Sequence, residues 1–135
     1  MKKLLSIKYS ASAFNTALFI LRVGAGVLLA AHGYDKLIHF QQFSSKFINF
    51  MGIGQSASLS LAIFAEFFCS IFVILGLFTR IAAIPILINM AVAIGKAHNY
   101  DFFGDAEKPT LFFLIFLTIL IVGPGKASVD GMINK

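Results

Sequence analysis

Two ionisable residues lie inside apolar stretches of the sequence and are the first candidates for chemistry. Arg22 and Glu66 are each flanked by runs of apolar side chains, and a charge near the centre of a bilayer costs at least about 2.5 kcal/mol on insertion scales. Such charges normally face a protein interior, where they pair or take part in function. The helical face of Arg22 also carries Ala25 and Gly26, which permit close helix packing. We therefore expect both charges to lie inside a helical bundle.

A second group of polar residues collects at the ends of the apolar stretches. His32 and Lys36 follow the first stretch, His98 ends a later one, and Glu107 begins the last. With a rise of about 1.5 Å per helical residue, His32 and His98 reach about the same height, and Glu66 lies about 5 Å lower. We expect these side chains to meet at one outward-facing mouth, in which His32 exchanges protons near neutral pH.

Helical phase limits how these residues combine. Asn89 is a further polar residue of the third apolar stretch, but nine positions separate it from His98, which is about 180° around a helix of about 3.6 residues per turn. These two side chains cannot both point inward unless the helix is distorted at Gly95. Arg22 and Glu66 differ in height by about 10 Å. A direct ion pair between them therefore requires an extended arginine.

The elements that must position these residues are membrane-spanning helices. Of 135 residues, 59% are hydrophobic and 13% are charged, whereas soluble domains carry about 25% charged residues. Only helices satisfy the backbone here, since four strands could not close a barrel in lipid. The sequence predicts one all-α domain over residues 1–135, an integral membrane four-helix bundle. The expected transmembrane helices cover about residues 14–33, 57–78, 81–98 and 109–123.

An amphipathic segment separates the first two of these helices. Its apolar side chains recur at spacings of three and four, at Leu37, Phe40, Phe43, Phe47 and Phe50. Polar side chains fill the opposite side. This periodicity predicts an interfacial helix over about residues 37–51, lying along the outer surface of the membrane.

The distribution of lysine and arginine predicts the orientation. With four helices both termini lie on one side, which carries six basic residues against four on the other. The six are Lys2, Lys3, Lys8, Arg80, Lys126 and Lys135, and the four are Lys36, Lys46, Lys96 and Lys108. The positive-inside rule then places the N- and C-termini in the cytoplasm. The net charge of +5 is mainly a topology signal, and the sequence shows no basic stripe of the kind that binds nucleic acid.

Several ligands fit this set of residues, and a purely structural role is an alternative to all of them. A quinone or another amphipathic ligand suits His and Glu side chains that exchange protons at a lipid-facing cleft. Haem between His32 and His98 is a weaker candidate because of the phase problem. A metal site is also weaker, since the sequence lacks HxxxH or ExxH spacing, and we assign no metal ligands. Cys69 is the single cysteine, which excludes dithiol chemistry within the chain.

Two inner motifs are expected to be architectural. In GLFTR, Gly76 loosens the end of one helix, Thr79 caps the next, and Arg80 anchors to anionic headgroups. In GPGKASVD the proline stops the last helix. We expect Ser128 or Asp130 to accept hydrogen bonds from nearby backbone amides.

Four segments carry a family resemblance. They are RVGAGVLLAAHGYDKL, AEFFCSIFVILGLFTRIAAI, NMAVAIGKAH and GPGKASVD. In this order and spacing they resemble the DoxX family of small four-helix membrane proteins, over about residues 18–131. The family-like positions are Arg22, His32, Gly33, Lys36, Glu66, Gly76, Thr79, Arg80, Asn89, His98, Gly123, Pro124, Gly125, Ser128 and Asp130.

The resemblance implies a bacterial cytoplasmic-membrane protein, in a family named for a subunit associated with quinone-linked oxidation. Some members are similar to partners in thiol or oxidative-stress complexes. The leading hypothesis is a redox subunit that works with the quinone pool beside a redox partner protein. Its expected catalytic residues are Arg22, His32 and Glu66. Its expected ligand-binding residues are Lys36, Asn89, His98 and Glu107.

Other functions stay open on the sequence alone, including whether the chain is an enzyme at all. If it is one, the resemblance implies an oxidoreductase subunit. A structural or chaperone-like membrane scaffold is the first alternative. A small-solute transporter is the second, although four short helices leave little room for alternating access. Helix faces rich in Gly and Ala make a homodimer reasonable.

Overall fold

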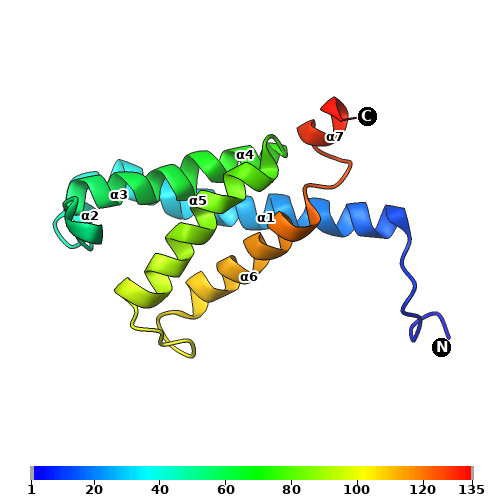
Figure 1. Cartoon of the computed structure of the whole chain (residues 1–135), viewed down its shortest axis with the longest axis horizontal. Coiled ribbons are helices and arrows are strands. Elements are labelled where there is room, and N and C mark those ends of the chain that lie inside the picture. Colours follow the sequence, from blue (N-terminus) through cyan, green and yellow to red (C-terminus); the bar gives the residue numbers. More distant parts are fainter. Residues whose placement is uncertain (1, 135) are drawn as a thin grey trace.

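The computed structural model describes residues 2–134, and all of their regular secondary structure is helical (Figure 1). Lys135, which enters the charge count above, lies outside the described residues. Four long helical segments follow one another. They are α1 (Ala11–Ile38), then α3 (Gln55–Ile63) continued by the π turn η2 (Phe64–Phe68) and α4 (Cys69–Leu75), then α5 (Thr79–Val92) with the π turn η3 (Ala93–Ala97), and α6 (Glu107–Val122). The short elements are α2 (Phe40–Ser44), the tight turn η1 (Phe50–Gly52) and α7 (Val129–Ile133).

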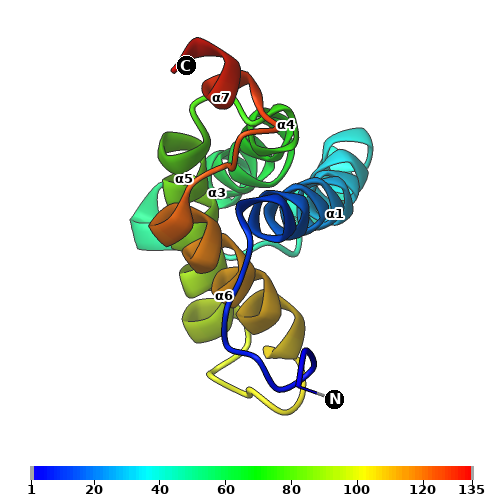
Figure 2. The ribbon, with the colours of Figure 1, turned by 90° about the vertical axis from the view of Figure 1, so that its right-hand side faces the viewer.

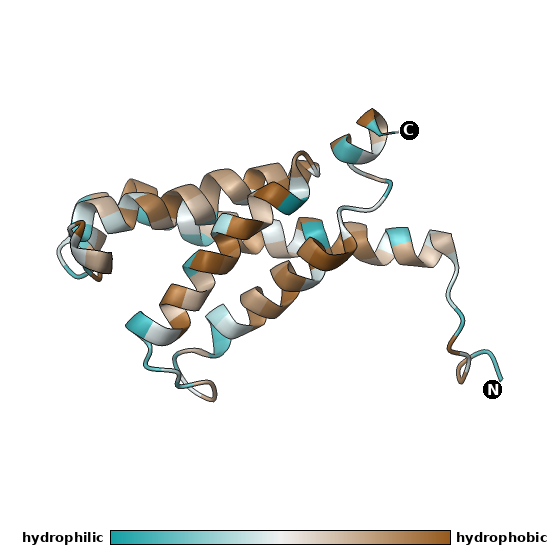
Figure 3. Cartoon of the chain, in the orientation of Figure 1, coloured by the Kyte–Doolittle hydropathy of each residue, from teal (hydrophilic) through white to brown (hydrophobic). Residues whose placement is uncertain are grey.

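Three of the long helices have the length and apolar composition required to cross a membrane. They cover Ala11–Ile38, Gln55–Leu75 and Thr79–Ala97, where the sequence predicts the first three spans. α6 has 16 residues, just under the usual minimum of about 17. Figure 3 shows that hydrophobic residues predominate along the long helices. Many large apolar side chains are exposed, among them Ile20, Val27, Leu28, Leu61, Ile81, Ile88, Leu111, Leu114 and Ile121. The all-α prediction is confirmed.

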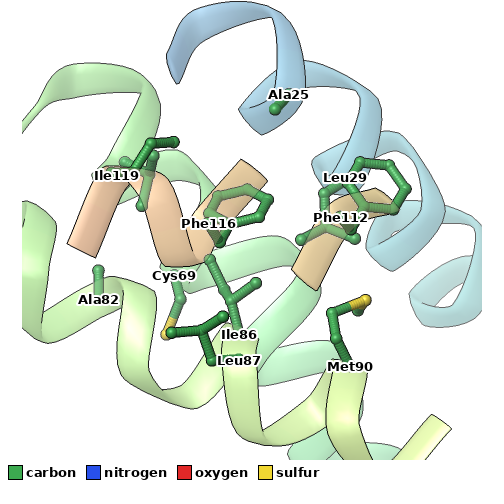
Figure 4. Close-up of a cluster of buried hydrophobic side chains, with 11 residues drawn as sticks. Ala25, Leu29, Cys69, Ala82, Ile86, Leu87, Met90, Phe112, Phe116 and Ile119 are labelled. Carbon is green, nitrogen blue, oxygen red and sulfur yellow. The ribbon is translucent and has the colours of Figure 1, made fainter. Parts of the chain in front are cut away.

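Side chains from all four long segments form one apolar core (Figure 4). α6 contributes Phe112, Phe116 and Ile119, and Phe116 and Ile119 are completely buried. The other members are Ala25 and Leu29 of α1, Cys69 and Val73 of α4, and Ala82, Ile86, Leu87 and Met90 of α5. In lipid such a core stabilises the fold through close van der Waals packing, since the surrounding acyl chains are equally apolar.

α1 and the second long segment approach most closely at two glycines. A Cβ atom at Gly33 would lie 2.6 Å from the amide nitrogen of Phe67 and 2.7 Å from the carbonyl carbon of Glu66. A Cβ atom at Gly26 would lie 2.6 Å from Cγ1 of Ile74. α1 continues for five residues beyond Gly33, where the expected span ends, and this glycine lies at a helix contact.

The segment between the first two long helices is not the continuous interfacial helix predicted over residues 37–51. Residues 37 and 38 belong to α1, α2 has only five residues, and residues 45–49 form no regular helix. Polar side chains form hydrogen bonds with backbone amides around this segment instead. The amide of Phe50 donates to Ser58 Oγ at 2.9 Å, and Asn49 Oδ1 accepts the amide of the glycine that precedes α3 at 2.8 Å. Local bonds of this kind compete with helix formation.

At the opposite end of the molecule, the C-terminal segment lies beside the turn between α4 and α5 (Figure 2). The carboxylate of Asp130 accepts the backbone amides of Phe78 and Thr79, both at 2.9 Å. The amide of Asp130 donates to the carbonyl of Gly76 at 2.8 Å. The expectation that Asp130 accepts amides is confirmed, whereas the predicted cap at Thr79 is wrong, because the amides at the start of α5 go to the aspartate. Arg80 donates to carbonyls in the last turn of α6.

Candidate functional site

Lys36, Glu66 and Asn89 meet between three helices. Lys36 Nζ lies 2.7 Å from Oε1 and 2.5 Å from Oε2 of Glu66, and Asn89 Nδ2 donates to Oε2 of Glu66 at 2.9 Å. The side chain of Glu66 is 5% exposed and that of Lys36 is 22% exposed. A carboxylate this deeply buried needs such partners, because an isolated charge would be costly to desolvate. We call these three residues the polar triad.

The polar triad lines a cavity of about 610 Å³, here named the outer cavity after the side of the membrane that the sequence predicts for it. Its other polar lining residues are Lys46, Ser58 and His98. The remaining walls are apolar and include Phe43, Phe47, Ile48, Phe50, Leu61, Ala62, Phe64, Ala65, Pro85, Ile88, Val92, Ala93 and Ala97. A largely apolar cavity with a few convergent polar groups is the usual form of a small-molecule site.

Two π turns place residues at this cavity. Glu66 lies within η2, and η3 separates Asn89 from His98 and contains Gly95. A π turn accommodates one additional residue, so nine positions act as about eight and the two side chains come within about 80° of each other. Both line the outer cavity. The helix is thus distorted at Gly95. The helical phase of the sequence required such a distortion for Asn89 and His98 to face inward together.

His32 and Glu107 do not join this site. His32 is exposed, and its ring packs edge-on against Phe112 of α6 with 6.1 Å between ring centroids. Glu107 is exposed at the start of α6. The expectation that His32 borders the same pocket is wrong. The outer cavity is lined by the second and third long segments and by residues 43–50, and Lys36 is its one lining residue from α1. The predicted proton exchange at His32 stays a prediction without support from the cavity. Haem held between the two histidines has no support either, since only His98 lines the cavity.

Arg22 belongs to a separate polar cluster near the other end of α1. The residue is 2% exposed, and its guanidinium donates to the carbonyl of Pro124 at 2.5 Å and to that of Ala127 at 2.7 Å. It does not pair with Glu66, in line with the difference in height expected from the sequence. Arg22 therefore fixes the C-terminal segment against the helices and does not touch the outer cavity.

Asp130 supplies the negative charge of this second cluster. Burial alone would raise the pKa of Asp130. The backbone amides of Thr79 and Phe78 and the positive charge of Arg22 more than offset that effect, so the pKa of Asp130 lies below its ordinary value. Sequence reasoning marked Asp130 only as an amide acceptor. Asp130 also acts as a counter-charge to Arg22. This role depends on how residues 123–130 fold back onto α1, and no pattern in the sequence predicts that these two residues lie close together.

The chain matches the DoxX family over residues 17–99. This match includes the whole polar triad and His98. The chain belongs to the DoxX family. It is similar to the uncharacterized membrane protein Rv3486 of Mycobacterium tuberculosis, with 29% identity over 130 residues that cover 85% of this chain and 80% of the relative. It is also similar to the inner membrane protein YphA of Escherichia coli, with 25% identity over 122 residues that cover 84% and 87% of the two chains. No solved structure matches.

These findings make the chain an integral membrane DoxX protein with several apolar helices in the bilayer. Within residues 2–134, no group of three or more His, Cys, Asp and Glu side chains is arranged to hold a metal ion. The outer cavity of this DoxX protein can instead donate hydrogen bonds from Lys36, accept or donate them at His98, and exchange a proton at either. Sequence reasoning named all three triad residues. It missed the aromatic walls, although the periodic phenylalanines of residues 40–50 were the available signal.

Proposed function

We propose that this DoxX protein is the membrane subunit of a redox system and binds the head group of a quinone in its outer cavity. The observation that carries the proposal is the polar triad with His98, set into walls of aromatic and aliphatic side chains. A quinone ring is flat and apolar, and its two carbonyl oxygens accept hydrogen bonds. The ring stacks among the phenylalanines, while Lys36 and His98 donate to the oxygens.

Proton exchange is the chemistry that the cavity supplies. Reduction of a quinone to a quinol adds two electrons and places one proton on each carbonyl oxygen. A redox partner protein supplies or removes the electrons. Lys36 and His98 hand protons to the two oxygens, and Glu66 holds the Lys36 ammonium in place through its 2.7 Å and 2.5 Å contacts. Asn89 keeps the Glu66 carboxylate oriented. The predicted thiol or oxidative-stress complex is another setting for the same subunit.

The proposed setting is the bacterial inner membrane, which the chain spans four times with both termini in the cytoplasm. The similarity to an inner membrane protein supports the location, and the excess of lysine and arginine supports the orientation. α6 completes the bundle although its 16 residues rise only about 24 Å. Glu107 and Lys108 at its start and Arg80 beside its end keep charges at the two boundaries, which accommodates a short span.

Binding of a short-chain quinone to the purified protein in lipid nanodiscs tests the proposal. Equilibrium dialysis should show saturable binding by the wild type, and Glu66→Gln and His98→Ala should each weaken it about tenfold or more. His98→Ala removes a hydrogen bond to the quinone and Glu66→Gln releases the Lys36 ammonium that donates the other, each worth about 1.5 kcal/mol. Glu107→Gln and His32→Ala are matched controls, since they make the same chemical changes outside the cavity. Both controls should bind like the wild type.

Two results would contradict the proposal. One is the absence of saturable quinone binding by folded wild-type protein. The other is equal weakening by Glu66→Gln and Glu107→Gln. The scaffold alternative gains from a specific observation, because the carboxylate of Glu66 is fully engaged by Lys36 and Asn89 as in a structural lock. It predicts that Glu66→Gln lowers stability while quinone never binds.

A further inference from the structure

The outer cavity adjoins a second hollow that is entirely apolar. This hollow, here named the tail groove, has a volume of about 360 Å³ and lies between the second long segment and α5. Its lining residues are Phe64, Cys69, Phe72, Phe78, Ile81, Ala82 and Pro85. Phe64 and Pro85 line the outer cavity as well. The two hollows therefore meet at a shared pair of side chains.

The tail groove runs away from the polar triad toward the turn between α4 and α5. The rise from Phe64 to Phe72 is about 12 Å at about 1.5 Å per residue. Cys69 and Ala82 form its floor, being 4% and 7% exposed, whereas Ile81 on its rim is 68% exposed. The groove is thus open on its lipid side and closed toward the core of the bundle.

We propose that the tail groove holds the isoprenoid tail of the same quinone whose head group lies in the outer cavity. This inference rests on the proposed function and extends it from a head group to a long-tailed substrate class. The two hollows match such a molecule in order, because hydrogen-bonding groups lie at one end and only apolar side chains at the other. The two hollows share Phe64 and Pro85 as lining residues.

The expected gain from the tail is moderate. The tail of a quinone dissolved in a bilayer is already removed from water, so binding in the groove gains no hydrophobic transfer free energy. The gain comes from van der Waals contacts with the groove. Because the head group tethers the tail beside the groove, the tail also reaches it at a high effective concentration. We expect a long-tailed quinone to bind about fivefold more tightly than a short-chain one, with both measured as mole fractions in the membrane.

Photolabelling of the wild-type protein in nanodiscs tests the path of the tail. The probe is an isoprenoid quinone with a diazirine near the middle of its tail, and cross-linked peptides are identified by mass spectrometry. Labelling should concentrate on Phe72, Phe78 and Ile81, and excess unlabelled long-tailed quinone should suppress it. A phospholipid with a diazirine in its acyl chain is the comparison. Equal labelling of the groove by this lipid, unaffected by the quinone, would overturn the inference.

A matched pair of substitutions tests the groove by affinity. Ala82→Leu fills its floor, and Ala91→Leu makes the same change at an exposed position of α5 outside both hollows. Ala82→Leu should abolish the advantage of the long tail and leave short-chain binding unchanged, while Ala91→Leu should alter neither. If Ala82→Leu fails to fold, the photolabelling decides alone. If the wild type binds short-chain quinone but shows no advantage for the long tail and no labelling of the groove, this inference is refuted and the proposed function stands. If the folded wild type does not bind short-chain quinone at all, the proposed function itself is refuted.

Discussion

Replacing Lys36 with methionine is the sharpest test of the polar triad. The substitution keeps an unbranched side chain in the last turn of α1 but leaves the Glu66 carboxylate with Asn89 as its one remaining partner in the triad. Removing one member of a buried ion pair costs about 3–5 kcal/mol, because the other charge stays buried without compensation. The Lys36 side chain is 22% exposed, so water reaches part of the site. We therefore expect Lys36→Met to lower the free energy of unfolding by about 3 kcal/mol, the lower end of that range.

A double-mutant cycle separates the pair from the loss of a side chain. Glu66→Gln removes the charge that Lys36 neutralises, so the double variant Lys36→Met/Glu66→Gln should recover much of the lost stability. We expect a coupling free energy of about 2 kcal/mol between the two positions. The assay is unfolding in mixed micelles by increasing SDS, followed by far-UV circular dichroism. Additive effects of the two substitutions would refute the reasoning.

Lys96→Met is the matched control for this cycle. Lys96 is exposed in η3 and does not line the outer cavity. Its replacement should change the free energy of unfolding by less than about 0.5 kcal/mol, as is usual for surface positions. Equal losses from Lys36→Met and Lys96→Met would show that the ion pair contributes nothing measurable.

Two further predictions concern the helix contact at Gly33 and the polar cluster of Arg22 and Asp130. Gly33→Ala should lower the free energy of unfolding by about 1–3 kcal/mol, the usual cost of overpacking, because its Cβ would lie 2.6 Å from the Phe67 amide nitrogen. Gly24→Ala, where a Cβ meets no atom within 4 Å, should be neutral or stabilising in the same SDS titration, and equal losses at both glycines would contradict the contact. Because the folded-state pKa of Asp130 is lowered, its stabilising contribution is fully present above the unfolded value of about 3.9 and is lost as the pH falls through the lower folded value. Unfolding titrations between neutral pH and pH 3 should therefore show an acid-dependent loss that Asp130→Asn reduces, and an unchanged pH profile in that variant would refute the assignment.

The helices could be predicted from the sequence more securely than their ends. Hydropathy over about 20 residues identifies a span whatever its neighbours are, which is why the three long spans lie where expected. The end of α1 depends on a partner. Gly33 is a plausible helix terminus by its conformational freedom, yet in the fold it is the point where η2 crosses α1. No local property of the sequence distinguishes these two uses of a glycine.

The members of the site could be predicted, but not their pairing. Charged and amide side chains in the apolar stretches identified Glu66 and Asn89, and Lys36 was identified as a polar residue just after the first stretch. Which charge neutralises Glu66 depends on the rotation of each helix. The difference in height counted against Arg22, but the sequence did not select Lys36 in its place. Helical phase did show that Asn89 and His98 would point in opposite directions from a regular helix. The π turn η3, which contains Gly95, changes this phase, and both residues line the outer cavity.

The two π turns also give this small protein a simple way to gain or lose its site. Each corresponds to a single residue inserted into an otherwise regular helix. Converting η3 into a regular α-helix at unchanged chain length would swing His98 by about 100° around the helix axis, out of line with Asn89, while the apolar character of the span would stay the same. Two chains of the same length and membrane architecture can thus differ in whether an acid–base group faces the cavity, through the hydrogen-bonding pattern of one helical turn.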